Sequence, residues 1–227
     1  MPNRSVNWAG RIAAVIRKDI VSEFRTRYAL NAILMFALVT LTVVSFSLGL
    51  LIPTKEILAS LFWVILFFAG MSGLAQAFIR EEETGTAMVL KLSADGTTVF
   101  FGKMIFNLLL LLALSILIVP LFMILLKTTP ADWPIFLAGV VPGLTGLAGS
   151  TAIIAAVVSK ASARGALFTV LSFPLLLPLL AGAIEITKVA FIGGGWADVS
   201  APLRLLIAYD VVMITLSVML FDFVWRQ

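Results

Sequence analysis

The side chains best suited to acid–base chemistry stand together at positions 80–86, which read REEETGT. Neighbouring carboxylates can act as a general acid and a general base when a fold encloses them. The chain contains no histidine and no cysteine, so it lacks imidazole and thiol chemistry, disulfides and the usual zinc and haem ligands. Glu81, Glu82 and Glu83 therefore favour a role other than catalysis, and we expect neither an enzyme nor a metal site in this chain.

The acidic run opens a polar connection between two apolar stretches, and its composition predicts a short helix. Negative charge is favourable at a helix N-terminus, where the backbone dipole and the unpaired amides attract it. The run MVLKL at 88–92 adds an apolar cluster that would not stay solvated on a free loop. We therefore predict a short amphipathic helix within residues 80–103 that another protein can grip. The residues assigned to that contact are Arg80, Glu81, Glu82, Glu83, Thr84, Gly85, Thr86 and Leu90.

The composition places this segment on a membrane protein. Of the 227 residues, 61% are hydrophobic and 12% are charged, and the mean hydropathy is +1.13. A bilayer-spanning helix needs about 20 apolar residues, and six windows qualify. They cover residues 29–52, 57–79, 104–126, 134–158, 166–186 and 204–224. We predict an all-α, multi-pass membrane protein with a single transmembrane domain over 1–227 and no room for a folded soluble domain.

The basic residues predict the orientation of these spans. With alternating spans, twelve of the 16 Lys and Arg residues fall on one side of the membrane and four on the other. Basic residues are enriched on the cytoplasmic side, which places both termini and the connections at 80–103 and 159–165 in the cytoplasm. The basic residues flank the spans and form no aromatic-interleaved face, so we expect no nucleic-acid binding.

The N-terminal segment, residues 1–28, predicts an amphipathic elbow helix in the lipid headgroup plane. Ile12, Ile16, Ile20 and Phe24 follow one helical face. The basic residues assigned to the elbow are Arg11, Arg17, Lys18 and Arg25. They interrupt every apolar run, so we expect no signal peptide. Two interpretations stay open: the helix only anchors the chain in lipid, or it also touches a cytoplasmic partner.

Small residues predict where the spans pack closely. The span at 134–158 carries Gly139, Gly143, Gly146 and Gly149, whose spacing by three or four residues lets a neighbouring helix approach its backbone. The span at 57–79 turns small at Gly70, Ser72, Gly73 and Ala75. Both faces are candidates for contacts between helices.

The last two spans carry residues that suit movement or buried polar contacts. Pro174 and Pro178 lie on one helical face and each removes a backbone donor, which predicts either a static kink or a hinge. Asp210 is an acid within the membrane, either a satisfied acceptor between helices or part of a relay. The segment at 187–203 predicts an outer connector, because Gly193, Gly194 and Gly195 interrupt regular structure.

The order of these parts resembles the permease subunits of ABC exporters with short cytoplasmic loops. The chain is most similar to the CcmB family, the B subunits of the cytochrome c maturation haem exporter. The similarity lies in LFWVILFFAGMSGLAQAFIREEETGT at 61–86, SKASARG at 159–165 and FPLLLPLL at 173–180. In such permeases the segment between the second and third spans is a coupling helix, seated in a cleft of a separate ATP-binding subunit. Its leucine-rich stretch usually ends in proline, whereas Ser93 and Ala94 follow Leu92 here.

The resemblance implies a subunit of the bacterial inner membrane that works beside the ATP-binding subunit CcmA, with CcmC, CcmD and the haem chaperone CcmE. It implies that ATP binds to the partner subunit and that haem is handled by the complex. Two copies would match two ATPase subunits, with the small-residue faces as contacts between the copies and membrane lipid around them. Whether haem is exported, or the loaded chaperone is released, stays open.

Two other functions are consistent with the residues alone. One is the permease of an ABC exporter for a lipid, a drug or a polysaccharide, and the other is a membrane scaffold or ion-coupled carrier. This chain offers haem iron only weak axial ligands such as methionine, Tyr28 and Tyr209. We therefore expect it to bind no cofactor directly. An axial-ligation signature from this chain in a visible spectrum with haem would contradict that expectation.

Overall fold

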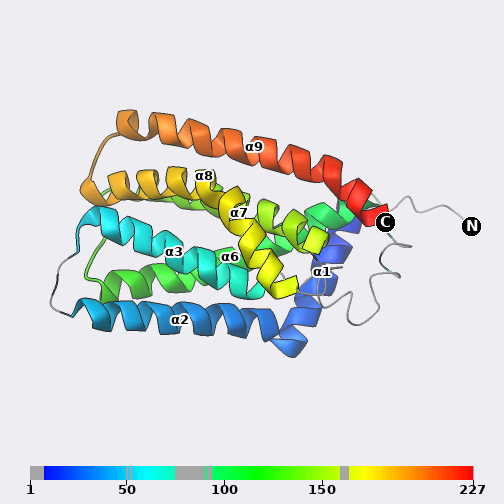
Figure 1. Ribbon diagram of the computed structural model, residues 1–227, viewed down its shortest axis with the longest axis horizontal. Helices are drawn as coiled ribbons and strands as arrows, with labels where there is room; N and C mark the ends of the chain where they lie inside the picture. The colour runs from blue at the N-terminus through cyan, green and yellow to red at the C-terminus, as the bar shows by residue number, and fades with distance from the viewer. Residues whose placement is uncertain are drawn as a thin grey trace, which may run out of the picture.

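The computed structural model describes residues 8–49, 51, 53–74, 90, 94–158 and 164–226, without the side chains of 164–166, 169 and 222–226. Within these ranges the chain forms seven helices and no strand, which confirms the all-α prediction. Six of the helices are long and apolar enough to cross a membrane, as predicted. They lie side by side in a bundle, and the first helix lies across one end of it (Figure 1).

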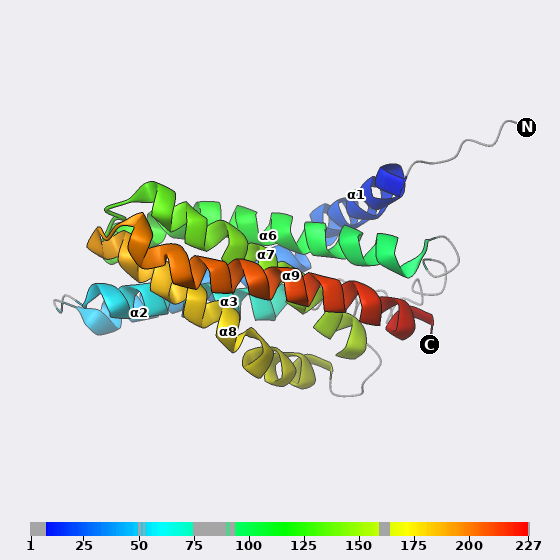
Figure 2. The ribbon, with the colours of Figure 1, turned by 90° about the horizontal axis from the view of Figure 1, so that it is seen from above.

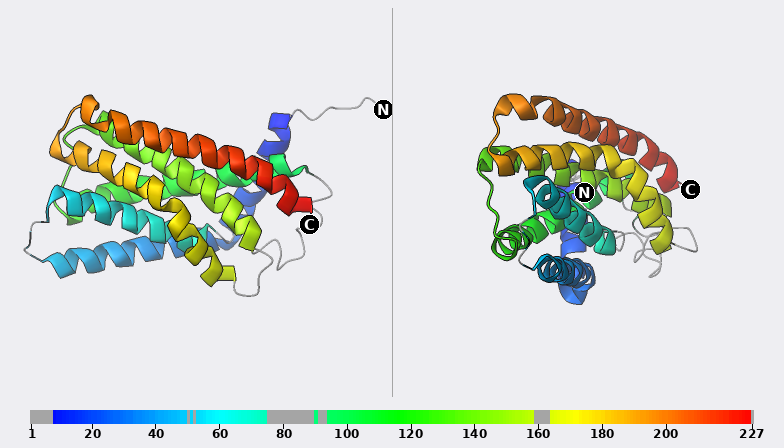
Figure 3. Two further views of the ribbon diagram at one scale, coloured as in Figure 1. Left: turned by 45° about the horizontal axis from the view of Figure 1, so that its top comes forward. Right: turned by 60° about the vertical axis from the view of Figure 1, so that its left-hand side comes forward.

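The helix across the end is α1, and the six spans follow it in order. Their bounds are α1 (Trp8–Thr26), α2 (Tyr28–Leu48), α3 (Lys55–Gly73), α6 (Gly96–Leu125), α7 (Trp133–Val158), α8 (Arg164–Ile192) and α9 (Trp196–Arg226). The start of α1 and the end of α9 lie at the same end of the bundle (Figures 1 and 3). Because the chain runs the length of the bundle six times, its two ends return to the same end of the bundle.

Three helices are longer than the hydropathy windows indicate. α6 begins at Gly96 rather than at 104, α8 ends at Ile192 rather than at 186, and α9 begins at Trp196 rather than at 204. Hydropathy marks the hydrocarbon core, which is about 30 Å thick, whereas the 30 residues of α6 extend over about 45 Å at about 1.5 Å per residue. The outer connector predicted at 187–203 is therefore wrong in length, because only residues 193–195 interrupt the helices.

The short turn between α8 and α9 depends on glycine and on one acid. Gly193 has φ +89°, a left-handed conformation that glycine adopts without strain. Asp198, in the first turn of α9, accepts a hydrogen bond of 2.9 Å from the Gly195 amide. The Ala190 carbonyl near the end of α8 accepts a further hydrogen bond, of 2.9 Å, from the Ala131 amide. These contacts join the end of α8 to the residues that precede α7 and to the start of α9.

α7 is the central helix, and it packs against α6, α8 and α9. Figures 2 and 3 show it between these helices, whereas α2 lies at one edge of the bundle. A Cβ placed on Gly143 would overlap the ring of Trp63 on α3, and one on Gly139 would lie 2.9 Å from Ile186 on α8. The glycines thus let large side chains reach the α7 backbone, and the predicted close packing of this span is confirmed.

The small-residue faces contact helices of the same chain. Besides the α7 glycines, Gly73 of α3 leaves room for Ile33 of α2, whose Cγ1 would lie 2.5 Å from an added Cβ. Gly70 faces Leu111 of α6 in the same way. At the described glycines, helices of the same chain already occupy the space that the sequence assigned to a second copy, whereas Ala75 lies outside the described residues.

A buried hydrogen bond between α3 and α8 fixes the orientation of the Trp63 side chain. The Trp63 indole Nε1–H donates to Thr187 Oγ1 at 2.8 Å, and both side chains are buried. Because lipid offers no competing partners, such a bond between helices resists separation of α3 from α8. The Trp63 side chain therefore sits in one place, with its ring on Gly143 and its N–H on α8.

We predict that Gly143→Ala destabilises the fold, because its methyl group would overlap the buried Trp63 ring. Overpacking of this kind costs about 1–3 kcal/mol. The control is Gly149→Ala on the same helix, where the nearest atoms would lie 3.4 Å and 3.5 Å away. Denaturant unfolding of both variants in detergent micelles measures the difference. Equal stabilities would contradict the account of α7 packing.

Candidate functional site

α1 lies against the first two turns of α6. Its buried residues are Ile12, Val15 and Asp19, which follow one face of the helix. Gly102 of α6 permits the close approach, because an added Cβ would lie 2.6 Å from Val15 Cγ1. A larger residue at 102 would push the two helices apart.

An ion pair is buried in this contact. Lys103 is fully buried and Asp19 is 7% exposed. Lys103 Nζ donates to Asp19 Oδ1 at 3.2 Å and lies 3.0 Å from Oδ2. The exposed Lys18 adds a second cation, 3.1 Å from Oδ1. Removing one partner from such a pair leaves a buried charge uncompensated, so the pair holds α1 on α6 in one position.

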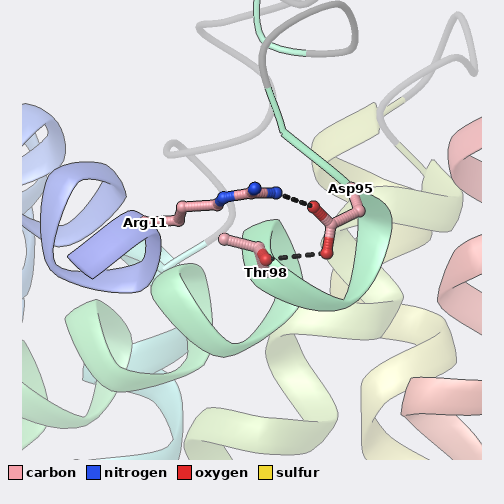
Figure 4. A network of polar contacts seen from close by, with 3 residues as sticks. All are labelled: Arg11, Asp95 and Thr98. Atoms are coloured by element: carbon pink, nitrogen blue, oxygen red, sulfur yellow. Dashed lines mark hydrogen bonds and ion pairs between the residues drawn. The ribbon is translucent and has the colours of Figure 1, made fainter. Parts of the chain in front are cut away.

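A second, exposed pair joins the same two helices. Arg11 Nη1 donates to Asp95 Oδ1 at 3.3 Å, and the Thr98 hydroxyl donates to Asp95 Oδ2 at 2.9 Å (Figure 4). The Thr98 hydrogen bond, with Arg11 beside it, holds the pKa of the Asp95 carboxyl below its usual value. Asp95 immediately precedes α6, where the helix dipole also favours a negative charge. We call these contacts, from Arg11, Val15 and Asp19 to Asp95, Gly102 and Lys103, the elbow clamp.

The turn from α1 into α2 is a single residue. Arg27 has φ +53° and ψ 22°, and the helices on either side end at Thr26 and begin at Tyr28. Glu23 of α1 reaches across this turn, because its Oε1 accepts a hydrogen bond of 2.7 Å from the Leu30 amide. That contact satisfies an otherwise unpaired donor at the start of α2. α2 is therefore joined to the clamp without a flexible linker.

The predicted coupling segment is described only in part. Arg80, Glu81, Glu82, Glu83, Thr84, Gly85 and Thr86 lie outside the described residues. Leu90 is described and is buried against the hydrophobic core, and its carbonyl accepts a hydrogen bond of 3.0 Å from the Ala94 amide. Asp95 of the elbow clamp follows at once, so the segment leads directly into the clamp.

The elbow prediction is right about the helix and incomplete about its face. Arg17, Lys18 and Arg25 are exposed, and Arg11 pairs with Asp95. Phe24, expected on the apolar face, is 71% exposed. The buried face instead carries Val15 and Asp19. Two signals could have found the pair: an acid seven residues after Ile12 on the apolar side of a basic helix, and a lone lysine in the apolar run FFGKMIFN.

Pro174 and Pro178 both lie within α8, which bends along its length (Figure 1). Each proline deprives one carbonyl of its helical partner. The Tyr209 hydroxyl of α9 donates to the Leu175 carbonyl at 2.9 Å and lies 3.3 Å from Ser150 Oγ of α7. The proline stretch is thus linked to α7 and α9. Whether it is a hinge stays a prediction.

Asp210, the predicted intramembrane acid, is 8% exposed. A Cβ on Gly146 would overlap its Oδ1 and also Leu179 Cδ1, so the carboxyl fills the space beside Gly146, next to α8. Its Oδ1 is buried and has no hydrogen-bond partner among the described residues. The interpretation of Asp210 as a satisfied acceptor does not hold for this atom. We call the contact of Gly146, Ser150, Leu175, Leu179, Tyr209 and Asp210 the α7–α8–α9 seam.

Comparison with known proteins gives one match over most of the chain. A family model described as CcmB protein matches residues 11–224. No curated protein matches the sequence. The matched range covers the elbow clamp, the predicted coupling segment and the α7–α8–α9 seam.

We predict that Asp19→Ala destabilises the protein by about 3–5 kcal/mol, because the buried Lys103 loses the carboxylate that lies 3.0 Å from its Nζ. Arg11→Ala, which removes the exposed pair between the same helices, costs less than about 1 kcal/mol. The double variant Asp19→Leu with Lys103→Met regains most of the loss, since it removes both charges. Unfolding free energies in mixed micelles measure all three. A single Asp19→Ala variant as stable as Arg11→Ala would contradict the clamp.

Proposed function

This chain belongs to the CcmB family, the permease subunits of the cytochrome c maturation haem-export ABC system, and we propose that it transmits force from the ATP-binding subunit CcmA to the membrane helices. CcmA supplies ATP binding and hydrolysis. The segment at 80–93 is the coupling helix that CcmA grips. Two copies of the chain serve two ATPase subunits, together with CcmC, CcmD and CcmE.

The observation that carries this proposal is the elbow clamp. Leu90 leads through Ala94 to Asp95 with a backbone hydrogen bond on the way, so movement of the coupling segment reaches the start of α6. The buried pair of Asp19 and Lys103 passes that movement to α1. The single-residue turn at Arg27 then passes it to α2. Two spans and the elbow therefore respond together.

The distribution of basic residues over the two ends of the bundle supports an orientation in the membrane. The positively charged elbow, the start of α6 and the end of α9 lie at one end, whereas Lys55, Lys127 and Lys188 lie near the opposite end. Because cytoplasmic connections carry the excess of Lys and Arg, we place both termini in the cytoplasm and the chain in the bacterial inner membrane. The coupling segment then faces the compartment that holds ATP.

The role of this chain in haem handling is mechanical. Without histidine or cysteine it offers no strong axial ligand, and the Tyr209 hydroxyl already donates to the Leu175 carbonyl. Repacking of the spans serves either haem export or release of the haem-loaded chaperone CcmE. The haem ligands belong to other subunits of the complex.

We predict that reversing charge at the coupling segment uncouples the complex. The triple variant Glu81→Lys, Glu82→Lys and Glu83→Lys inserts into the membrane but loses most of its co-purifying CcmA, because the charge that the segment presents to the cleft is then reversed. A strain that depends on it accumulates little holocytochrome c. The control, Glu185→Lys, changes an exposed acid at the opposite end of the bundle and leaves both readouts unchanged.

Two results would contradict the proposal in different ways. A triple variant that retains a full complement of CcmA would show that this segment is not the coupling helix. A strain that lacks the gene but still matures c-type cytochromes would place the chain in another exporter. Holocytochrome content, measured by haem staining of membrane and periplasmic fractions, distinguishes the second case from the first.

A further inference from the structure

The Asp210 carboxyl fits a specific space inside the helix bundle. It lies near the middle of α9 (Trp196–Arg226), and its carboxyl takes the space that a side chain on Gly146 would fill. Leu179 of α8 borders the same space. A residue with a Cβ at 146 would displace the acid, so the glycine and the acid fit each other.

Among the described side chains, the helices packed against α9 present no counter-charge to this carboxyl. The side chains of α7 are uncharged. Among the described side chains of α8, Glu185 pairs with Lys188 near the outer end. On α6 the one charged side chain is Lys103, bound to Asp19. On α9 itself the neighbour is Tyr209, whose hydroxyl donates to the Leu175 carbonyl.

An ionised carboxylate in this place would be costly. Moving an unpaired charge from water into an apolar interior costs several kcal/mol even after relaxation, and such groups neutralise instead. Asp210 Oδ1 is buried without a hydrogen-bond partner among the described residues. No described cation lies beside the carboxyl, so a proton is the ligand that removes its charge.

We propose that Asp210 is a proton-binding site whose occupancy follows the packing of the α7–α8–α9 seam. With the seam packed, the carboxyl carries a proton. When α8 and α9 separate, water reaches the acid and the proton leaves to water, with no other bond made or broken. The Tyr209 bond to Leu175 lies between the two prolines of α8, so a change of the α8 bend and opening of the site involve the same contact.

Linkage gives the sign of the effect. A proton that binds the packed seam and leaves the open one stabilises the packed arrangement, so raising the pH favours opening. A neutral amide at 210 mimics the protonated acid in shape and lacks the titration. The site therefore makes repacking of the spans sensitive to proton concentration, independently of where CcmA binds.

Infrared spectroscopy of the full chain in lipid vesicles tests the protonation directly. At pH 7 we expect the carbonyl band of a protonated carboxylic acid in the natural protein, its loss in Asp210→Asn, and its retention in Asp198→Asn, which changes an exposed acid. A carboxylate band that disappears in Asp210→Asn would overturn the proposal. If that variant does not fold, carbodiimide labelling of the natural chain replaces it. An adduct mapped to Asp210 supports a protonated carboxyl, and adducts only at other acids oppose it.

The absence of native cysteine allows a test of the link to packing. Ser217, buried on α9 two turns after Asp210, is changed to cysteine, and its maleimide reaction is normalised to that of an exposed cysteine at Val212. We expect the normalised rate to rise with pH, by up to about tenfold per unit, and to be flat in Asp210→Asn. The same pH dependence in both chains would overturn the coupling.

Discussion

The buried contact of Asp19 with Lys103 constrains how the end of the bundle that carries α1 can move. Apolar contacts between helices tolerate sliding, because one methyl group replaces another at little cost. A buried ion pair resists such sliding, because displacement of one helix would separate the two charges where water cannot solvate them. Lys103 is fully buried, and Gly102 beside it allows Val15 to approach the backbone. The elbow is therefore docked in a defined position rather than floating in the headgroup layer.

The contacts that hold the helices together differ along the bundle. At the clamp, α1, α2 and α6 are joined by charge, by a one-residue turn and by a side-chain cap. Along the middle, the α7 glycines bring Trp63 and Asp210 onto one backbone. At α8 the two prolines weaken the helical hydrogen bonding, and the Tyr209 hydroxyl supplies a bond from the neighbouring helix. A force applied at Asp95 would act first on the rigid unit of α1, α2 and α6, and only afterwards on the bent helix α8.

The sequence predicts the membrane-spanning helices, because the bilayer dictates their composition. It misses contacts between residues that are far apart in the chain. The bilayer demands long apolar helices whose backbone groups are satisfied internally, so six spans follow from hydropathy. The extra turns of α6, α8 and α9 were missed because hydropathy does not detect helix beyond the hydrocarbon core. The glycine spacing predicted close packing but could not say that Trp63 and Asp210 would fill it. Asp19 and Lys103 are 84 positions apart, and no local period connects them.

The central claim is that the elbow and the start of α6 move as one body when the ATPase subunits close. Because the chain has no native cysteine, spin labels can be placed in pairs at Arg17 of α1, Leu109 of α6 and Val170 of α8, all exposed. Distances are measured in the whole complex, with and without trapped nucleotide. The account predicts an unchanged distance from Arg17 to Leu109 and a changed distance from Leu109 to Val170. A nucleotide-dependent change between Arg17 and Leu109 would contradict it.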